Sequence, residues 1–421
     1  MVTHSTRLVN LTLRGITLGT RFLFIFFLAR YLDPASVGYY GIFTATIGYA
    51  IYLVGLDFYT YVSREIVATP PEERGKLLKA QAALSGLLYL MLFPVALLFL
   101  ANSDWPGYLT FWFIPILMLE HFNQEVSRLL IALNEQLTSS AILFVRQGSW
   151  ALAIIIFMYT NASTRNLDFV MALWAMAGAT AASIGVWKLK QLKTEGWQLA
   201  IDWGWVKKGI LVSGSFLIAT LALRGVQTID RYWLESLGGI EIVGAYVLLL
   251  GIAGTLLTFL DAAVFAFAYP HLISLNHQNQ LQRARQQVKK LFIQTMVISV
   301  LFAVTSWLVL PFFLGWIGNS LYQDSAHWYP WLLAAMIFNA LGMVPHYALY
   351  AMGNDKPIIH SHIAALVVFL AITATISNFI GFESIFLGLI FSFATLLIWK
   401  GMAYLILSTK VKPTTPTPAN I

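Results

Sequence analysis

The sequence predicts an all-α membrane protein of about twelve transmembrane helices, arranged as two six-helix lobes related by a pseudo-twofold axis along the membrane normal. Three observations lead to this prediction. Of the 421 residues, 58% are hydrophobic and 11% are charged, whereas soluble domains carry about 25% charged residues. The apolar residues form runs of about 20, which is the length of a helix that crosses a hydrocarbon layer. Finally, one turn motif occurs in each half of the chain.

The apolar runs, read between Gly, Pro and charged residues, define the expected spans. The first six are expected at 11–29, 37–58, 81–101, 109–132, 138–160 and 168–187. The second six are expected at 209–229, 243–268, 291–317, 329–351, 359–380 and 385–407.

This spacing divides the chain into two lobes. We expect an N-terminal lobe over 1–190, a basic cytoplasmic linker over 191–208 and a C-terminal lobe over 209–407. Residues 408–421 are expected to form a disordered cytoplasmic tail, because this segment is rich in Pro and Thr and too poor in apolar residues to pack.

The basic residues predict the orientation. An even number of spans places both termini on one side, and 18 of the 26 Lys and Arg residues fall on that side. The opposite loops carry three, and five lie inside spans. Cytoplasmic loops of membrane proteins carry an excess of Lys and Arg, so we expect both termini to be cytoplasmic.

The repeated turn consists of "RYLDPASVGYY" at 30–40 and "RYWLESLGGIEIVGAY" at 231–246. Each copy joins the first span of a half to the second, and "LD" recurs near the inner end of that second span at 56–57 and 260–261. Parallel repeats of this kind are a transporter feature, with the substrate site expected near the bilayer midplane between the lobes.

Three stretches resemble signatures of bacterial polysaccharide-biosynthesis membrane proteins. They are "ARYLDPASVGYYGIFTA" (29–45), "VGLDFYTYVSREI" (54–66) and "IDRYWLESLGGIEIVGAYVLL" (229–249). The resemblance is to the O-antigen-type flippases of lipid-linked oligosaccharides, within the multidrug/oligosaccharidyl-lipid/polysaccharide exporter superfamily. It implies movement of an undecaprenyl-pyrophosphate-linked repeat unit from the inner to the outer leaflet of the bacterial inner membrane.

Arginines inside the first span are the leading candidates for the substrate site. A charged group in mid-span costs about 2.5 to 3.5 kcal/mol on insertion scales, so it normally faces a bundle interior or an aqueous cavity. Arg14 and Arg21 lie seven residues apart on one helix face together with Thr17. Their guanidinium groups match phosphate oxygens bidentately, which predicts a site for a pyrophosphate. The alternatives are that Arg14 snorkels to the membrane edge and that Arg21 pairs with an acid.

Arg146 in the fifth expected span and Arg224 in the seventh are two further candidates for cations in the lumen. Lys400, close to the inner interface, is expected to snorkel. Glu120 lies in mid-span, where it is a counter-ion if it lies beside Arg21 or Arg146 and a candidate proton carrier if it does not.

Asp57 and Asp261, the acids of the two "LD" pairs, are further candidates for a coupling acid or for caps of the helices. They are therefore grouped with Glu120 as possible counter-ions or coupling groups.

The apolar spans contain no cysteine, no paired catalytic acids, no phosphate-cradling loop and no nucleophile with its base, so we expect neither an enzyme nor a metal or other cofactor. The alternatives to a flippase are a multidrug or cation antiporter, which would want acids in its cavity, and a glycan polymerase or ligase, which would need a large outer loop. The expected partners are the polyprenyl-linked glycan, membrane lipid and, by resemblance, a polysaccharide polymerase and a chain-length regulator. No nucleic acid is expected, and the default oligomeric state is a monomer.

Overall fold

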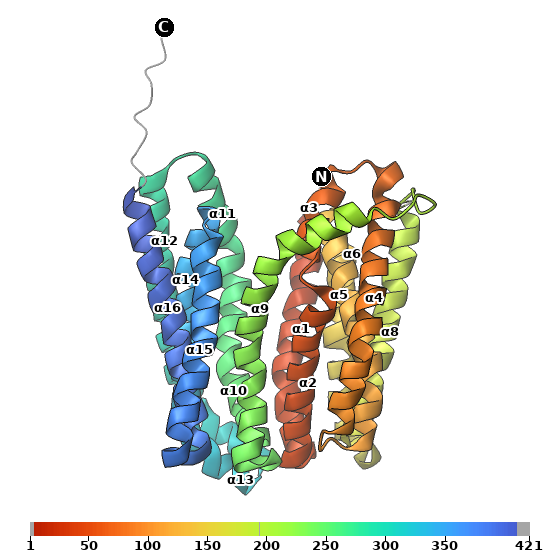
Figure 1. Cartoon of the computed structure of the whole chain (residues 1–421). Helices are drawn as coiled ribbons and strands as arrows, with labels where there is room; N and C mark the ends of the chain where they lie inside the picture. Colours follow the sequence, from red (N-terminus) through yellow and green to blue (C-terminus); the bar gives the residue numbers. More distant parts are fainter. Residues whose placement is uncertain (1–3, 193, 411–421) are drawn as a thin grey trace. The chain divides into compact units, whose positions relative to one another are not determined.

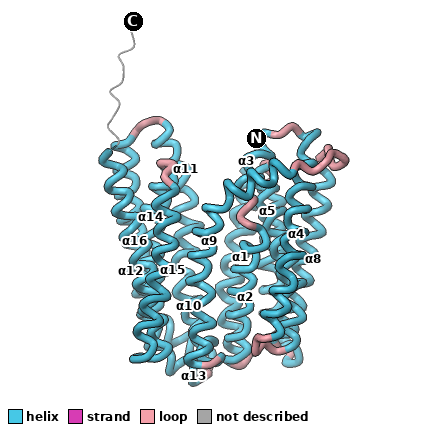
Figure 2. Tube along the Cα trace, in the orientation of Figure 1, coloured by secondary structure: helices cyan, strands magenta, loops and turns pink. Residues whose placement is uncertain are grey.

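All regular structure in the described part of the chain is helical, as the computed structural model of residues 4–192 and 194–410 shows (Figure 2). The tail that the sequence predicts over 408–421 lies mostly outside these residues. The chain consists of two compact units, Met1–Arg224 and Gly225–Ile421.

The first unit contains the long helices of the N-terminal half and the start of α9 (Figure 1). Its elements are α1 (His4–Tyr31), α2 (Pro34–Gly55), α3 (Tyr59–Ala68), η1 (Pro71–Glu73), α4 (Arg74–Ala101), α5 (Gly107–Ala132), α6 (Gln136–Leu143), η2 (Phe144–Ser149), α7 (Trp150–Thr160), η3 (Ala162–Thr164), α8 (Leu167–Gln191) and the first part of α9 (Trp203–Gly238).

The second unit contains the rest of α9 and the helices that follow it. These are α10 (Ile240–Leu260), η4 (Asp261–Phe265), α11 (Ala266–His277), α12 (Leu281–Ile317), α13 (Ser320–Asp324), η5 (Ser325–Trp328), α14 (Tyr329–Ala351), α15 (Asp355–Ile380), η6 (Gly381–Glu383) and α16 (Ser384–Lys410).

Length and hydropathy identify 10 candidate membrane spans among the described residues. One of them, Asp355–Thr409, contains both α15 and α16, which are separated by a turn in which Gly381 has a φ of 63°. Helix α5 is not among the ten, and it carries Glu120, His121 and Glu125 within its length. Counting α15 and α16 separately and adding α5 brings the number of spans to the expected twelve. The predicted all-α membrane fold is confirmed.

The two copies of the repeated turn start their second helices by different means. At the first copy the side chain of Asp33 accepts a hydrogen bond from the Ser36 amide at 2.9 Å, and Pro34 occupies the first helical turn of α2. Both residues are favoured at helix starts. At the second copy α9 continues to Gly238, and Gly239, with a φ of 85°, makes the turn into α10. The extra residues of the second copy thus extend a helix.

Both Leu-Asp pairs mark an interruption of a helix. Leu56 and Asp57 each have a φ of 51°, so α2 ends there and α3 begins two residues later. In the second half α10 is regular up to Leu260, and Asp261 opens the π-helical turn η4. A recurring pair in the sequence therefore corresponds to a recurring break in the second span of each half.

Residues 195–202, within the predicted linker, pack against the start of α4. The Gly75 amide donates to the Glu195 carbonyl at 2.6 Å, and Lys79 Nζ donates to the Leu199 carbonyl at 3.2 Å. Asp202 accepts from the Trp205 amide at 3.0 Å, which, together with nearby Lys76, holds the pKa of the Asp202 carboxyl below its usual range. Because α9 starts at Trp203, the last six residues of the predicted linker are helical.

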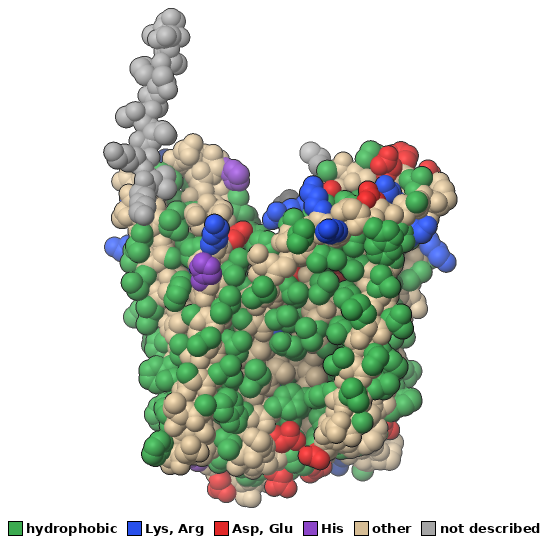
Figure 3. Space-filling model, viewed as in Figure 1, with side chains coloured by type: hydrophobic (Ala, Val, Ile, Leu, Met, Phe, Trp, Pro, Cys, Tyr) green, Lys and Arg blue, Asp and Glu red, His purple; other side chains and the backbone are tan. Residues whose placement is uncertain are grey.

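On the face drawn in Figure 3, apolar side chains cover most of the length of the first unit, and the Lys and Arg side chains seen there lie mainly at the end that holds the α3–α4 connection. This is the distribution expected of a helix bundle surrounded by hydrocarbon. In the second unit, α14 and α16 lie in close contact through Gly342, where an added Cβ would be 3.4 Å from the Leu397 amide nitrogen.

The contact between α15 and α16 depends on Gly388. A Cβ at this position would lie 2.3 Å from Thr373 Oγ1 and 3.1 Å from Phe369 Cδ2. We expect Gly388→Ala to destabilise the purified protein by about 1 to 3 kcal/mol through overpacking. Thermal unfolding in detergent measures this change. Gly254→Ala, where nothing lies within 4 Å of the added Cβ, is the matched control, and an equal loss in both variants would contradict the packing argument.

Candidate functional site

Two arginines of α1 are held by the neighbouring segment α6–η2. Arg14 Nε donates to Ser140 Oγ at 3.2 Å, and Arg21 Nη1 donates to Gln147 Oε1 at 2.9 Å. Each partner lies 126 residues after its arginine, so the seven-residue spacing in α1 is matched by the same spacing opposite. Both arginines are exposed, and neither forms a salt bridge within the described part of the chain.

The segment opposite α1 contains a π-helical turn. Residues Phe144–Ser149 form η2 between α6 and α7, and this turn carries both Arg146 and Gln147. The contact is close at Gly148, where a Cβ would lie 3.2 Å from Thr17 Oγ1. π-Helical turns are rare and often occur at functional sites. Here the turn directs Gln147 to Arg21 and Arg146 to a different neighbour, α5.

Arg146 forms a buried ion pair with Glu120. Arg146 Nε lies 3.5 Å from Glu120 Oε2, and each side chain is 8% exposed. Trp174 Nε1 donates to the other carboxylate oxygen, Glu120 Oε1, at 2.9 Å. Of the two roles that the sequence left open for Glu120, the geometry is that of a counter-ion, and it is Arg146 rather than Arg21 that it neutralises.

Aromatic side chains enclose this ion pair. The rings of Trp150 and Trp174 stack with centroids 5.4 Å apart, and Trp150 Nε1 donates to the Arg146 carbonyl at 2.7 Å. Half-buried Tyr40 is an electrostatic neighbour of both Arg21 and Glu120. Sequence reasoning missed these residues. The signal was available, since Trp150 lies inside a span, away from the membrane interface where tryptophan is usually enriched.

A second group of charges lies at the break between α2 and α3. Asp57 is only 4% exposed, and its cationic neighbours are Arg128 and Arg224. The Arg224 guanidinium carbon lies 5.4 Å from the centroid of the Tyr52 ring, a cation–π distance. Asp57 and Arg224, predicted separately as a coupling acid and a lumen cation, are thus brought into one cluster.

Arg128 is fixed in this cluster by Glu125 and by the ring of Tyr59. It donates to Glu125 Oε1 at 2.9 Å and lies 3.4 Å from the centroid of the Tyr59 ring. Gln81 Nε2 donates to the other oxygen, Glu125 Oε2, at 2.6 Å. The arrangement links α3, α4 and α5 of the first unit through charged and polar groups.

Asp261 occupies a different environment in the second unit. It is exposed at the start of η4 and accepts a long hydrogen bond, 3.5 Å, from Tyr347 Oη. Lys400 is only 2% exposed, which contradicts the expectation that it snorkels to the interface. It is an electrostatic neighbour of His346, whose ring stacks on that of His362 with centroids 6.1 Å apart.

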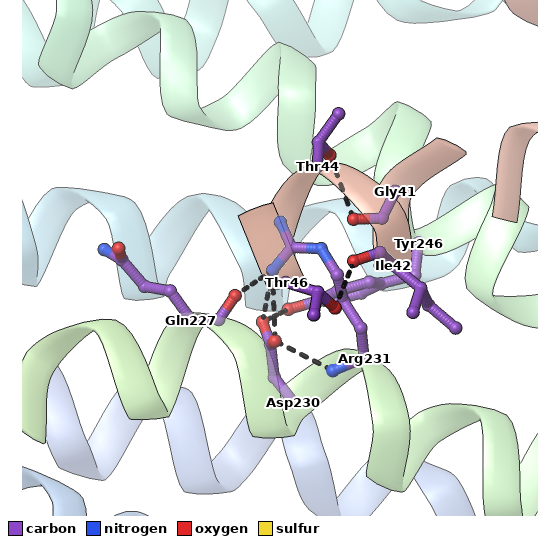
Figure 4. A network of polar contacts seen from close by, with 8 residues as sticks. All are labelled: Gly41, Ile42, Thr44, Thr46, Gln227, Asp230, Arg231 and Tyr246. Atoms are coloured by element: carbon purple, nitrogen blue, oxygen red, sulfur yellow. Dashed lines mark hydrogen bonds and ion pairs between the residues drawn. The ribbon is translucent and has the colours of Figure 1, made fainter. Parts of the chain in front are cut away.

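Near the end of α9, Asp230 forms a network with its neighbours (Figure 4). Arg231 Nη1 lies 3.1 Å from Asp230 Oδ1 and also donates to the Gln227 carbonyl. Tyr246 Oη of α10 donates to Asp230 Oδ2. Asp230 is 1% exposed, so its hydrogen bond with Tyr246 joins α9 to α10 from a buried position.

Within the described residues no group of three His, Cys, Asp or Glu side chains is placed to hold a metal ion.

Comparison with known proteins agrees with this architecture. Residues 7–276 match the family described as polysaccharide biosynthesis protein. A Shigella flexneri protein named "Putative O-antigen transporter" is 24% identical, over 82% of this chain and 84% of its own.

Solved structures share the fold. An inward-facing MATE-family multidrug resistance transporter matches with a TM-score of 0.75 at 12% identity, covering 96% of both chains. A mutant of a Vibrio cholerae MATE transporter matches with a TM-score of 0.67 at 13% identity, covering 97% of this chain and 96% of its own. A Pyrococcus furiosus transporter described as having a binding pocket of reversed polarity matches with a TM-score of 0.61 at 12% identity, covering 97% of this chain and 99% of its own.

These findings define the class first: this is a multi-pass membrane protein with the fold of the multidrug/oligosaccharidyl-lipid/polysaccharide exporter superfamily. Within that class, the chain belongs to the family of polysaccharide biosynthesis proteins. The resemblance stated from the sequence is confirmed.

The buried ion pair predicts an asymmetric response to mutation. Glu120→Gln leaves Arg146 buried without its counter-ion, so we expect a loss of stability of about 3 to 5 kcal/mol. The double variant Glu120→Gln with Arg146→Gln removes both charges and should recover most of that loss. Thermal unfolding in detergent compares the two. A double variant that is as unstable as the single one would show that the charges do not compensate each other.

Proposed function

We propose that the protein is a flippase that moves an undecaprenyl-pyrophosphate-linked oligosaccharide repeat unit from the inner to the outer leaflet by alternating access. One observation carries the proposal: Arg14 and Arg21 lie in a membrane span, are exposed, and are held by the neutral side chains of Ser140 and Gln147. Family membership and the name of the Shigella flexneri relative support the same substrate class.

The α1 arginines suit a pyrophosphate for reasons of charge and spacing. Seven residues of α-helix place them about 10 Å apart along the axis. Each guanidinium retains donors beyond the one it gives to its neutral partner, and a guanidinium binds phosphate oxygens in a bidentate manner. A pyrophosphate could therefore bind at one arginine and pass to the other without leaving positive surroundings.

Arg146 and Arg224 take different parts in this proposal. Arg146 is neutralised by Glu120 at 3.5 Å, so it adds little net charge to the site and acts mainly by positioning its neighbours. Arg224 belongs to the cluster with Asp57 and Tyr52, where a change in the charge of Asp57 would alter the cationic character of the whole group.

Outward movement of an anion follows an inside-negative membrane potential, which contributes about 2.3 kcal/mol per charge per 100 mV to it. For a further coupling to an ion gradient, Asp57 and Asp261 are the acids we propose. Both lie where the second span of a half is interrupted. We place the protein in the bacterial inner membrane with cytoplasmic termini, acting as a monomer beside a polymerase and a chain-length regulator.

Deletion of the gene tests the function directly. Single lipid-linked repeat units should accumulate on the inner leaflet, as measured by extraction of lipid-linked glycans and by protection from an added membrane-impermeant label. Units that accumulate facing outward would point instead to a polymerase or ligase. Unchanged lipid-linked intermediates would point to an antiporter.

Arg21→Ala tests the carrying observation. We expect loss of glycan export at normal protein abundance, because the site loses a bidentate anion donor, while Arg21→Lys should keep partial activity with its single ammonium. Complementation of the deletion strain, scored by glycan display and immunoblot, measures both. Arg64→Ala, an exposed arginine of α3, is the control. Full display by the Arg21→Ala strain would remove Arg21 from the mechanism.

A further inference from the structure

An open groove runs along the surface of the second unit between α12, α14 and α16. Its volume is about 390 Å³, within the roughly 300 to 1,000 Å³ range of small-molecule sites. Val344, Pro345, Leu397 and Leu405 contribute to its apolar lining, and Leu405 is 63% exposed. An apolar hollow that opens on the hydrophobic side of a membrane helix bundle is in contact with lipid.

The groove is charged at one end only. Arg285 and Lys289, one turn apart at the start of α12, line it together with Ser408 near the end of α16. Arg285 donates to the Ser408 carbonyl, which holds its guanidinium over the mouth of the groove. Neither basic side chain has a salt bridge among the described residues, so both charges are available to an anion.

Length and shape match one acyl chain below a headgroup. From Ser408 to Leu397, α16 descends about 16 Å at 1.5 Å per residue. Gly401 lies midway along this path, and nothing stands within 4 Å of the position that its Cβ would take. The missing side chain thus leaves the middle of the groove open, so that a chain can lie along it.

We propose that this groove binds an anionic phospholipid, with the phosphate held by Arg285 and Lys289 and one acyl chain lying over Gly401. Charge complementarity selects the occupant: the groove offers two cations at its mouth and an apolar path below them. The start of α12 lies within the basic segment 271–290, between the eighth and ninth expected spans, which the predicted orientation places on the cytoplasmic side. The inner leaflet is the one that carries anionic lipid. The site shares no residue with the α1 arginines and does not depend on the proposed glycan transport.

Lipid titration of the full-length protein in uncharged detergent tests the proposal. Phosphatidylglycerol is compared with phosphatidylcholine that has the same acyl chains. The measured quantity is the concentration of each lipid needed to raise the unfolding temperature of the protein. We expect phosphatidylglycerol to bind more tightly, and Arg285→Gln with Lys289→Gln to weaken it by roughly 25-fold, at roughly fivefold for each basic residue. Lys290→Gln, an exposed lysine that does not line the groove, should leave binding unchanged.

Two more variants distinguish the contribution of the lipid headgroup to binding from that of the acyl chain. Gly401→Leu should weaken both lipids by filling the groove, while Lys289→Gln alone gives a roughly fivefold loss for phosphatidylglycerol if the double variant does not fold. Equal binding of the two lipids by the unaltered protein would overturn the proposal, as would unchanged selectivity in the Lys289→Gln variant. Tighter binding of polyprenyl phosphate that the same substitutions abolish would also overturn it, because the groove would then serve the substrate's tail.

Discussion

The Glu120–Arg146 ion pair determines the charge that the interior of the first unit presents. A lone arginine buried among α1, α5 and α8 would be prohibitively unfavourable, and the carboxylate at 3.5 Å, itself held by Trp174, removes that penalty. Because the Glu120 carboxylate pairs with Arg146, it does not neutralise Arg21. The aromatic stack of Trp150 on Trp174 then shields this neutral pair, while the two exposed arginines of α1 keep their positive charge.

The periodic features of the chain could be predicted from the sequence, and the local ones could not. Hydropathy placed the spans, and a helical repeat of 3.6 residues put Arg14, Thr17 and Arg21 on one face. The partner of Arg21, Gln147, lies in the π-helical turn η2, which changes the direction in which Arg146 and Gln147 point. Nothing in the composition of the segment indicates this turn. Lys400 shows the same limit: its position near the end of a span suggested snorkelling, whereas packing of α14, α15 and α16 buries it. Side-chain direction near a span end is decided by neighbouring helices, which one segment does not reveal.

The two halves reach similar local structure through different chemistry. An Asp-Pro start and a glycine turn both introduce the second span, and a pair of left-handed residues and a π-helical turn both interrupt it. What recurs is the location of the break, beside an aspartate in each half. Such breaks free backbone groups that hydrocarbon cannot satisfy, so they persist in membrane helices only where protein or water surrounds them. The surroundings of the two aspartates differ accordingly, buried for Asp57 and exposed for Asp261.

Uncompensated charge in a span is the feature that stability alone does not explain. Arg14 and Arg21 each carry an insertion cost of about 2.5 to 3.5 kcal/mol, and a neutral partner such as Ser140 or Gln147 returns less than a carboxylate would. A carboxylate can neutralise an arginine in the same bundle, since Glu120 pairs with Arg146. Two arginines that are oriented by neutral groups therefore remain able to exchange those contacts for an external anion, whereas Arg146, enclosed by tryptophan and paired with Glu120, does not. The contrast between α1 and η2 separates the exposed arginines that we propose bind the substrate from the buried Arg146, which is paired within the bundle.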